Sequence, residues 1–166
     1  MATILPITFH HVAGFHAALD SVARERDFLA MVEAPPLEWA QEFVSDIIAK
    51  GHAQVVALEE GTVVGWCDIL PQRSRPGFQH CGSVGMGVVR AWRGRGLGKA
   101  LLASCIERAF ASGLTRIELE VYADNLPAIA LYRRLGFAEE GRKRRARFLD
   151  GRYQDLLMMA LLREED

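Results

Sequence analysis

The nine residues 92–100 (Trp-Arg-Gly-Arg-Gly-Leu-Gly-Lys-Ala) combine three glycines with three basic side chains. An apolar stripe then repeats at helical spacing from Leu97 to Phe110, which predicts a helix over residues 96–112. A loop that leads into a helix start presents unpaired backbone N–H groups, and the helix dipole favours an anion there. Glycines also remove the side chains that would keep a phosphate away from the backbone. The pattern therefore predicts a binding site for the phosphate groups of a cofactor.

Two common phosphate-binding motifs do not fit this loop. A nucleoside triphosphate loop requires a glycine five positions before Gly98-Lys99 and a Ser or Thr after it, whereas the sequence has Arg93 and Ala100. A dinucleotide fingerprint requires a glycine or alanine three residues after its second glycine, but Lys99 and Leu101 stand at those positions. The loop is therefore better suited to another phosphate-bearing cofactor.

Around this loop the sequence alternates between strand and helix patterns and predicts a mixed α/β domain with one central sheet. The predicted strands cover residues 3–9, 53–59, 62–70, 80–89, 116–122, 137–148 and 152–161, the last two as a hairpin around Asp150-Gly151. The predicted helices cover residues 15–23, 37–50 and 96–112, with a fourth that begins after Asp124 or Asn125 and stops at Gly136. Residues 71–79 are predicted as a loop.

The bulk composition narrows the class of protein. The chain has 166 residues, of which 50% are hydrophobic and 25% charged, with a formal net charge of -1. This balance favours one globular domain and gives no basic footprint for nucleic acid. The N-terminus shows neither a signal peptide nor a membrane-spanning pattern. Three cysteines without a CxxC pair favour a reducing, cytoplasmic setting and argue against a structural metal site.

Two segments resemble the signatures of the GNAT superfamily of N-acetyltransferases. The first is Arg93-x-x-Gly96-x-Gly98, which is similar to the family's acetyl-coenzyme A motif. The second is residues 117–137, where a strand ending in Leu-x-Val is followed by Asn, Ala, Leu-Tyr and Gly-Phe. The resemblance covers residues 55–162 and is closest to the bacterial amino-acid N-acetyltransferases of this superfamily.

The resemblance implies a single domain over residues 1–166 with the acyl-CoA N-acyltransferase fold, a single mixed, mostly antiparallel sheet of about seven strands flanked by four helices. It also implies transfer of an acetyl group from acetyl-CoA, the acyl-donor cosubstrate, to a primary amine by direct attack in a ternary complex. The pyrophosphate is expected on the backbone of the loop, and the pantetheine arm along the preceding strand, which is splayed from its neighbour. The residues implied to bind acetyl-CoA are Met86, Gly87, Val88, Arg93, Gly94, Arg95, Gly96, Leu97, Gly98, Lys99, Asn125 and Ala128. Gly82, Gly85 and Gly87 would then be thin backbone beside the ligand.

The resemblance identifies Tyr132 with the family's general acid, which protonates the departing thiolate, although its helical spacing also fits a core position. A backbone N–H near Val88 is expected to stabilise the oxyanion. The candidates for the base that deprotonates the amine are His80, Asp68, Glu118 and Glu120, with a water chain as an alternative to any single base. His80 has a suitable ordinary pKa, and Asp68 is a carboxylate in an otherwise apolar strand.

Other interpretations stay open. Cys81 and Cys105 would allow a ping-pong route, but His80 is expected on the opposite face of the strand from Cys81. The same fold could serve as a non-catalytic acyl-CoA-binding or regulatory module. The acceptor could be a protein N-terminus or a lysine side chain, although a small-molecule amine is favoured. The basic run over residues 142–147 fits a solvated strand better than nucleic-acid binding, and a homodimer is compatible with the family.

Overall fold

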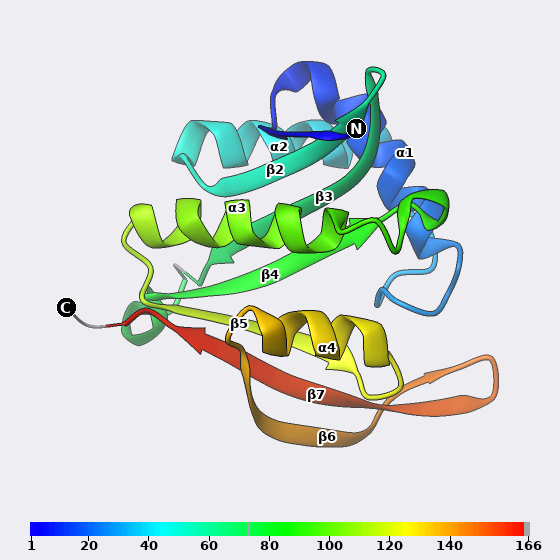
Figure 1. The fold of residues 1–166 in the computed structure, drawn as a ribbon, viewed down its shortest axis with the longest axis vertical. Helices are drawn as coiled ribbons and strands as arrows, with labels where there is room; N and C mark the ends of the chain where they lie inside the picture. The colour runs from blue at the N-terminus through cyan, green and yellow to red at the C-terminus, as the bar shows by residue number, and fades with distance from the viewer. Residues whose placement is uncertain (73, 165–166) are drawn as a thin grey trace.

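The computed structural model describes residues 1–72 and 74–164 and arranges their strands in one sheet with the order β1-β2-β3-β4-β5-β7-β6 (Figure 1). The strands are β1 Thr3–Pro6, β2 Ala53–Glu59, β3 Thr62–Pro71, β4 Cys81–Val88, β5 Arg116–Tyr122, β6 Ala138–Leu149 and β7 Arg152–Leu162. The helices are α1 Val12–Ala23, α2 Leu37–Lys50, α3 Leu97–Ala111 and α4 Leu126–Arg134. Residue 73, in the predicted loop over 71–79, lies outside the described residues. Within the described ranges, no helix combines the length and apolar character needed to cross a membrane.

The described residues confirm the predicted mixed, mostly antiparallel sheet of seven strands with four helices. The boundaries differ most at the N-terminus, where the strand predicted over residues 3–9 ends at Pro6. There the Thr8 backbone N–H donates to Nδ1 of His11 at 3.1 Å. The Thr8 N–H thus bonds to a side chain instead of to the neighbouring strand. The strand therefore ends, and the chain turns into a short 3-10 segment before α1.

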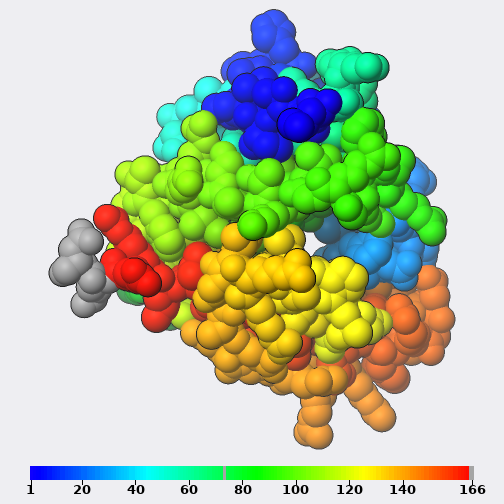
Figure 2. Space-filling view, in the orientation of Figure 1, coloured from blue at the N-terminus to red at the C-terminus, as the bar shows by residue number. Residues whose placement is uncertain are grey.

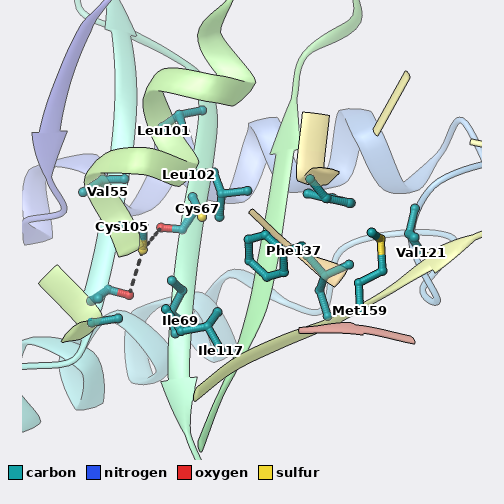
Figure 3. Packing of buried hydrophobic residues seen from close by; sticks show 14 of the residues in the cluster. Val55, Cys67, Ile69, Leu101, Leu102, Cys105, Ile117, Val121, Phe137 and Met159 are labelled. Atoms are coloured by element: carbon teal, nitrogen blue, oxygen red, sulfur yellow. Dashed lines mark hydrogen bonds between the residues drawn. The ribbon is translucent and has the colours of Figure 1, made fainter. Parts of the chain in front are cut away.

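Apolar side chains gather in two clusters, one on each face of the sheet. The first cluster packs α3 and α4 against the strands, and the second packs α1 and α2 against the other face. Figure 3 shows the first cluster, where the Cys105 thiol donates to the carbonyls of Cys67 and Ala53 at 3.5 and 3.6 Å. Because successive side chains of a strand point to opposite faces, Cys67 faces α3 while its neighbours Trp66 and Asp68 face α1 and α2.

The parallel neighbours β4 and β5 separate after a short paired stretch. Their register pairs Cys81 with Arg116, Gly82 with Ile117 and Ser83 with Glu118. Beyond this point β4 continues beside β3 and β5 beside β7, so the two strands diverge from left to right in Figure 1. The edge of β4 that faces β5 is therefore open from Val84 to Val88, and the splay implied by the family resemblance is confirmed.

Two of the glycines in β4 leave room for side chains of the same chain. A Cβ at Gly87 would lie 2.3 Å from the Trp66 ring. A Cβ at Gly82 would lie 2.7 Å from both Ile69 and Leu114. Buried side chains of β3 and of the segment before β5 therefore explain why these two positions are glycine, and the expectation that a ligand lies beside them stays a prediction.

Candidate active site

The predicted phosphate loop turns into α3 through two glycines in the left-handed region. Gly94 has a φ of 73° and Gly96, the N-cap, has a φ of 81°, values that residues with a side chain rarely adopt. The first hydrogen bond of the helix runs from the Ala100 N–H to the Gly96 carbonyl at 3.1 Å. The N–H groups of residues 97–99 precede that donor and point out of the helix end, as at every helix start. They offer an anion backbone donors at the positive end of the helix dipole.

The Arg93 side chain contacts the protein rather than the open helix end. Its guanidinium donates to both carboxylate oxygens of Glu25, at 2.8 and 2.5 Å, and to the Val88 carbonyl at 2.8 Å. It also lies over the Phe28 ring, 4.6 Å from the centroid. Glu25 thus neutralises the charge of Arg93, and the arginine joins the loop to the segment after α1.

Three elements meet around Gly98 in the first turn of α3. A Cβ at this position would lie 3.2 Å from Leu131 of α4 and 3.8 Å from Met86 of β4. Leu97 packs beside it against the first apolar cluster. The helix start, α4 and the splayed part of β4 therefore border the same space.

The other predicted cofactor contacts lie at this helix start and at the start of α4. Arg95 lies over the Trp92 ring at 4.5 Å, and Lys99 is exposed. Asn125 is the N-cap of α4, and its side chain accepts a hydrogen bond from the Ala128 N–H at 3.3 Å. Capping accounts for Asn125 in full, so a contact between Asn125 or Ala128 and acetyl-CoA stays a prediction.

The open edge of β4 carries the backbone groups that are expected to meet a pantetheine arm. The Val89 N–H donates to the Val64 carbonyl of β3 at 2.9 Å. Because N–H groups alternate between the two edges of a strand, those of Met86 and Val88 point to the opposite edge, into the splay. Gly87, between them, directs its backbone groups to β3. Of the three predicted strand residues, Met86 and Val88 are the two that offer backbone hydrogen bonds to a ligand.

Figure 2 shows an opening at the splayed end of the sheet, bordered by the green segment before α3, the yellow start of α4 and the blue segment after α1. We call residues 24–36, which connect α1 to α2, the strap. Besides its contact with the phosphate loop, the strap is tied to the β6–β7 hairpin. Arg26 donates to both carboxylate oxygens of Asp150, at 2.8 and 2.7 Å. Arg147 donates to the carbonyls of Arg26 and Leu29 at 2.9 and 3.2 Å.

Tyr132 lies in α4 on the α3/α4 face, with 8% of the residue exposed and its ring centroid 5.9 Å from that of Phe137. Burial, with a smaller contribution from Cys67, raises the pKa of its hydroxyl well above the ordinary value. Cys67 is the register partner of Met86, which places this hydroxyl near the splayed part of β4. In residues 1–72 and 74–164 the hydroxyl has no hydrogen-bond partner, and its oxygen is not one of the fully enclosed atoms.

Asp68 lies on the opposite face, in β3, and is 7% exposed. A Cβ at its register partner Gly85 would lie 2.9 Å from one carboxylate oxygen, so this glycine makes room for the carboxylate. Burial raises the pKa of Asp68 to about 7. Across the described part of the chain, the carboxylate has neither an ion pair nor a hydrogen bond. A buried carboxyl that titrates near neutrality is suited to proton exchange.

His80 lies at the closed end of the β4/β5 pair, away from the splay. Its carbonyl accepts hydrogen bonds from the N–H groups of Thr115 and Arg116 at 3.0 and 3.2 Å. About eight residues of extended chain, or roughly 26 Å, separate it from Val88. The structure therefore does not bring His80 to the splay, whereas the register partner of Asp68 lies only about three residues from Val88.

The expected separation of His80 from Cys81 is wrong. His80 lies in a turn before β4, so strand alternation does not apply to it, and its Nε2 lies 3.4 Å from the Cys81 sulfur. Burial raises the pKa of the Cys81 thiol, and nearby Glu118 acts in the same direction. A protonated thiol at the closed end of the splay is poorly suited to nucleophilic attack. The Cys105 thiol is buried and directed at backbone carbonyls.

The remaining predicted acids are engaged with other side chains. Glu118 accepts a hydrogen bond from Gln72 at 2.5 Å. Glu120 pairs with Lys143, which belongs to the basic run over residues 142–147 in β6. The pair between Lys143 and Glu120 fits the interpretation of the basic run as a solvated strand.

Sequence reasoning missed two residues at this site. Glu25 holds Arg93, but nothing in the sequence pairs residues that lie 68 positions apart. Gln54 is 3% exposed and is the cross-strand partner of Asp68. Its signal was available, because Gln54 is a polar residue in the apolar strand predicted over residues 53–59, the same kind of signal that singled out Asp68.

Comparison with known proteins identifies the family. Residues 15–137 match the model of the Acetyltransferase (GNAT) family. The chain is 38% identical over 111 residues to the L-amino acid N-acetyltransferase AaaT of Escherichia coli (strain K12). The aligned region covers 66% of this chain and 68% of that protein. It is 37% identical over 112 residues to the N-alpha-acetyltransferase RimI of Mycobacterium tuberculosis (strain ATCC 25618 / H37Rv). That aligned region covers 67% of this chain and 65% of that protein. A crystal structure of a GNAT superfamily phosphinothricin acetyltransferase (Pat) from Sinorhizobium meliloti in complex with AcCoA is 25% identical, with a TM-score of 0.90 over 97% of this chain and 88% of that chain.

The chain therefore belongs to the GNAT family of acetyltransferases. It is an acyltransferase, and its acyl donor is acetyl-CoA. The matches to AaaT and RimI span about two thirds of each of those proteins.

The Glu25→Gln variant tests whether the contact of Arg93 with the strap positions the phosphate loop. We expect the Kd for CoA to rise about fivefold, because a charge-assisted hydrogen bond that fixes the loop contributes about 1 kcal/mol. Isothermal titration calorimetry measures this change. Asp46→Asn, in the exposed pair with Lys50, is the matched control and should bind CoA like the wild type. Unchanged CoA affinity in a folded Glu25→Gln variant would show that the loop needs no such support.

Proposed function

We propose that this protein transfers the acetyl group of acetyl-CoA to the primary amine of a small molecule such as an amino acid, by direct attack within a ternary complex. The observation that carries the proposal is the splay between β4 and β5, with Tyr132 on one face of the sheet and Asp68 on the other. The donor enters from the α3/α4 face, the acceptor from the α1/α2 face, and the two meet in the splay. The similarity to AaaT supports an amino-acid acceptor.

The donor site uses backbone groups that the protein leaves free. The N–H groups of residues 97–99 bind the pyrophosphate, and Arg95 adds positive charge. The pantetheine arm pairs with the open edge of β4 around Met86, as an added strand does, and the Val88 N–H is left for the acetyl carbonyl. Asn125 borders the same opening at the start of α4. The acetyl thioester that this arrangement delivers to the splay supplies the activated acyl group.

The bond changes occur in the splay. The amine nitrogen of the acceptor forms a bond to the thioester carbonyl carbon, the nitrogen then releases its second proton to water, and the carbon–sulfur bond breaks. The Val88 N–H donates to the carbonyl oxygen as negative charge develops on it, a contribution worth about 3 kcal/mol for a well-placed donor. This route needs no cysteine nucleophile, in keeping with the position of Cys81 at the closed end of the splay.

Asp68 takes the proton that the acceptor ammonium must lose before its nitrogen can attack. Its pKa of about 7 suits this role, because the carboxylate is ionised when the ammonium arrives and still releases the proton to water afterwards. His80 is too far from the splay, and Glu118 and Glu120 are engaged with other side chains. Asp68 is therefore the favoured base among the four candidates.

Tyr132 assists the departing thiolate from the opposite face. Its raised pKa keeps the hydroxyl protonated throughout the working pH range, so the donor is always present. The same raised pKa disfavours complete transfer to a thiolate whose conjugate acid has a pKa of about 8.5. Its contribution is a hydrogen bond that strengthens as charge develops on sulfur, and solvent supplies the final proton.

The strap favours a small acceptor. Its contacts with Arg93 on one side and with Arg147 and Asp150 on the other fix it at the border of the opening, so an acceptor enters beside it. The second candidate acceptor is a protein N-terminus, which the similarity to RimI supports.

We also infer a reducing compartment such as the cytoplasm, which the three free and buried thiols Cys67, Cys81 and Cys105 support. The single domain over residues 1–166 and the homodimer stay predictions. So does the expectation that the protein has no nucleic-acid or membrane partner.

The acceptor class is tested by release of the coenzyme thiol from acetyl-CoA with panels of single amino acids, polyamines and short peptides with free N-termini. We expect a single amino acid to give the highest kcat/KM, by about tenfold or more, because the strap restricts the acceptor side. Preference for a peptide would favour the second candidate. CoA binding without turnover on any amine would favour a non-catalytic acyl-CoA-binding module.

The Tyr132→Phe variant separates catalysis from donor binding. We expect kcat to fall about 100-fold, because the hydrogen bond to sulfur is lost, while the Kd for CoA stays unchanged. Steady-state kinetics and calorimetry measure the two quantities. Tyr153→Phe, at a residue that is 55% exposed, is the control and should retain full activity. Full turnover by Tyr132→Phe would leave Tyr132 as a packing residue.

The Asp68→Asn variant tests the base. Asp68 is protonated below pH 7 and ionised above it, so the wild-type kcat/KM should rise through about pH 7. In Asp68→Asn we expect kcat/KM to fall about 100-fold and this limb of the pH profile to disappear, leaving the titration of the acceptor itself. His80→Ala should keep the limb. Loss of the limb in His80→Ala with its retention in Asp68→Asn would transfer the role to the histidine.

A further inference from the structure

A row of three residues crosses β2, β3 and β4 on the α1/α2 face. The register pairs Gln54 with Asp68 and Asp68 with Gly85, so the three lie side by side across the sheet. Directly opposite residues of antiparallel strands have Cβ atoms about 4.5–5.5 Å apart. Gln54 is therefore the side chain of β2 nearest to Asp68, and Gly85 leaves room for the carboxylate on the other side.

Gln54 is buried more deeply than Asp68. It is 3% exposed, and both its Oε1 and its Nε2 are fully enclosed without a hydrogen-bond partner among the residues that the structure describes. A buried amide without a partner is unfavourable, and native proteins nearly always satisfy such groups, often with an ordered water. The Asp68 oxygens are not among the fully enclosed atoms in that part of the chain. The carboxylate thus faces the accessible side, and the amide lies behind it.

We propose that Gln54 is a positioning residue for acetyl transfer, whose side chain rotates so that its amide N–H donates a hydrogen bond directly to the Asp68 carboxylate on the neighbouring strand. This inference rests on the proposed role of Asp68 as the base. The hydrogen bond holds the carboxylate toward the splay and stabilises its ionised form, which is the form that accepts the proton of the acceptor. Gln54 itself touches neither substrate.

The titratable groups around Asp68 stay the same in the variants below, so a change in the pKa of Asp68 reports the loss of this hydrogen bond. The titratable groups in this part of the described sheet include His52 just before β2, and Glu118, Glu120 and Tyr122 across the splay on β5. Beside Gly85, β4 contributes Ser83, and α1 and α2 cover this face with apolar side chains. None of these groups changes in the variants below. Burial is what raises the pKa of Asp68, so loss of a donor to its ionised form should raise that pKa further.

The Gln54→Met variant keeps the length of the side chain and removes the amide. We expect the acid limb of kcat/KM against pH to move up by about one pH unit, with recovery of the rate at high pH and an unchanged KM for acetyl-CoA. One acceptor is used for all variants, so that its own titration cancels. A loss of rate that is equal at every pH, with the limb unmoved, would indicate a purely structural role and overturn the proposal. Gln54→Leu provides a second apolar variant for the same comparison.

The double variant Gln54→Met/Asp68→Asn tests whether the glutamine acts through the aspartate. Residues that act as one unit are not additive, so the double variant should be no slower than Asp68→Asn alone. A further loss in the double variant would show that Gln54 acts on the reaction by another route and would contradict the proposal.

Thermal unfolding gives a readout that does not depend on catalysis. The fall in Tm caused by Gln54→Met should be larger at about pH 8.5, where Asp68 is ionised, than at about pH 5.5, where it is protonated. If the amide has no partner, its replacement by Met should leave the Tm unchanged or raise it at both pH values. Gln154→Met is the matched control, because this buried glutamine donates to Asp124 instead, and its effect on Tm should be the same at both pH values.

The outcomes separate the two proposals. If Asp68→Asn keeps the wild-type rate and pH profile, the assignment of the base fails. If Asp68→Asn removes the acid limb but Gln54→Met neither moves it nor shows a pH-dependent Tm change, the inference about Gln54 alone fails.

Discussion

The short parallel pairing of β4 and β5 is the constraint on which the whole site depends. The two strands pair only from Cys81 to Ser83 on the β4 side, after which each follows a different neighbour. A sheet that closed along its full length would satisfy the backbone groups of Met86 and Val88 and leave no passage between its two faces. Because the strands diverge, the N–H groups of Met86 and Val88 stay available at a point that both faces can reach. The divergence of β4 and β5 thus produces both the open edge of β4 and the passage between the two faces of the sheet.

The strap stabilises this open arrangement from both sides. Arg93 contacts Glu25 in the strap and the Val88 carbonyl at the splayed edge, so a single guanidinium joins three parts of the site. Arg147 and Asp150 hold the other side of the strap to the β6–β7 hairpin. A partly buried ion pair of this kind contributes little net stability, and its effect lies in fixing geometry. Arg93, the arginine of the first motif, therefore holds the loop in place. The backbone N–H groups at the start of α3 remain free to face an anion.

Local features of the site could be predicted from the sequence, and features that depend on tertiary register could not. The glycine loop, the helix after it and the cap at Asn125 follow from neighbouring residues, so the sequence predicts them correctly. The end of β4 at which His80 lies depends on which residues of β4 and β5 pair. The requirement for glycine at position 87 depends on Trp66 of the adjacent strand. The partner of Arg93 lies in a different helix connection and has no local signal.

Burial raises the pKa of both Tyr132 and Asp68, but the consequences for the proposed reaction are opposite. It raises the pKa of Tyr132, so the hydroxyl keeps its proton and remains a donor at any working pH. It raises the pKa of Asp68 to about 7, which brings a carboxyl that is normally ionised into the range of reversible exchange. Cys67 and Asp68 are consecutive in β3 and face opposite sides of the sheet, Cys67 toward Tyr132 and Asp68 toward α1 and α2. In the reaction that we propose, β3 thus lies between Asp68, which takes the proton of the amine, and Tyr132, which donates a hydrogen bond to the departing sulfur. The splay is where the amine and the thioester meet.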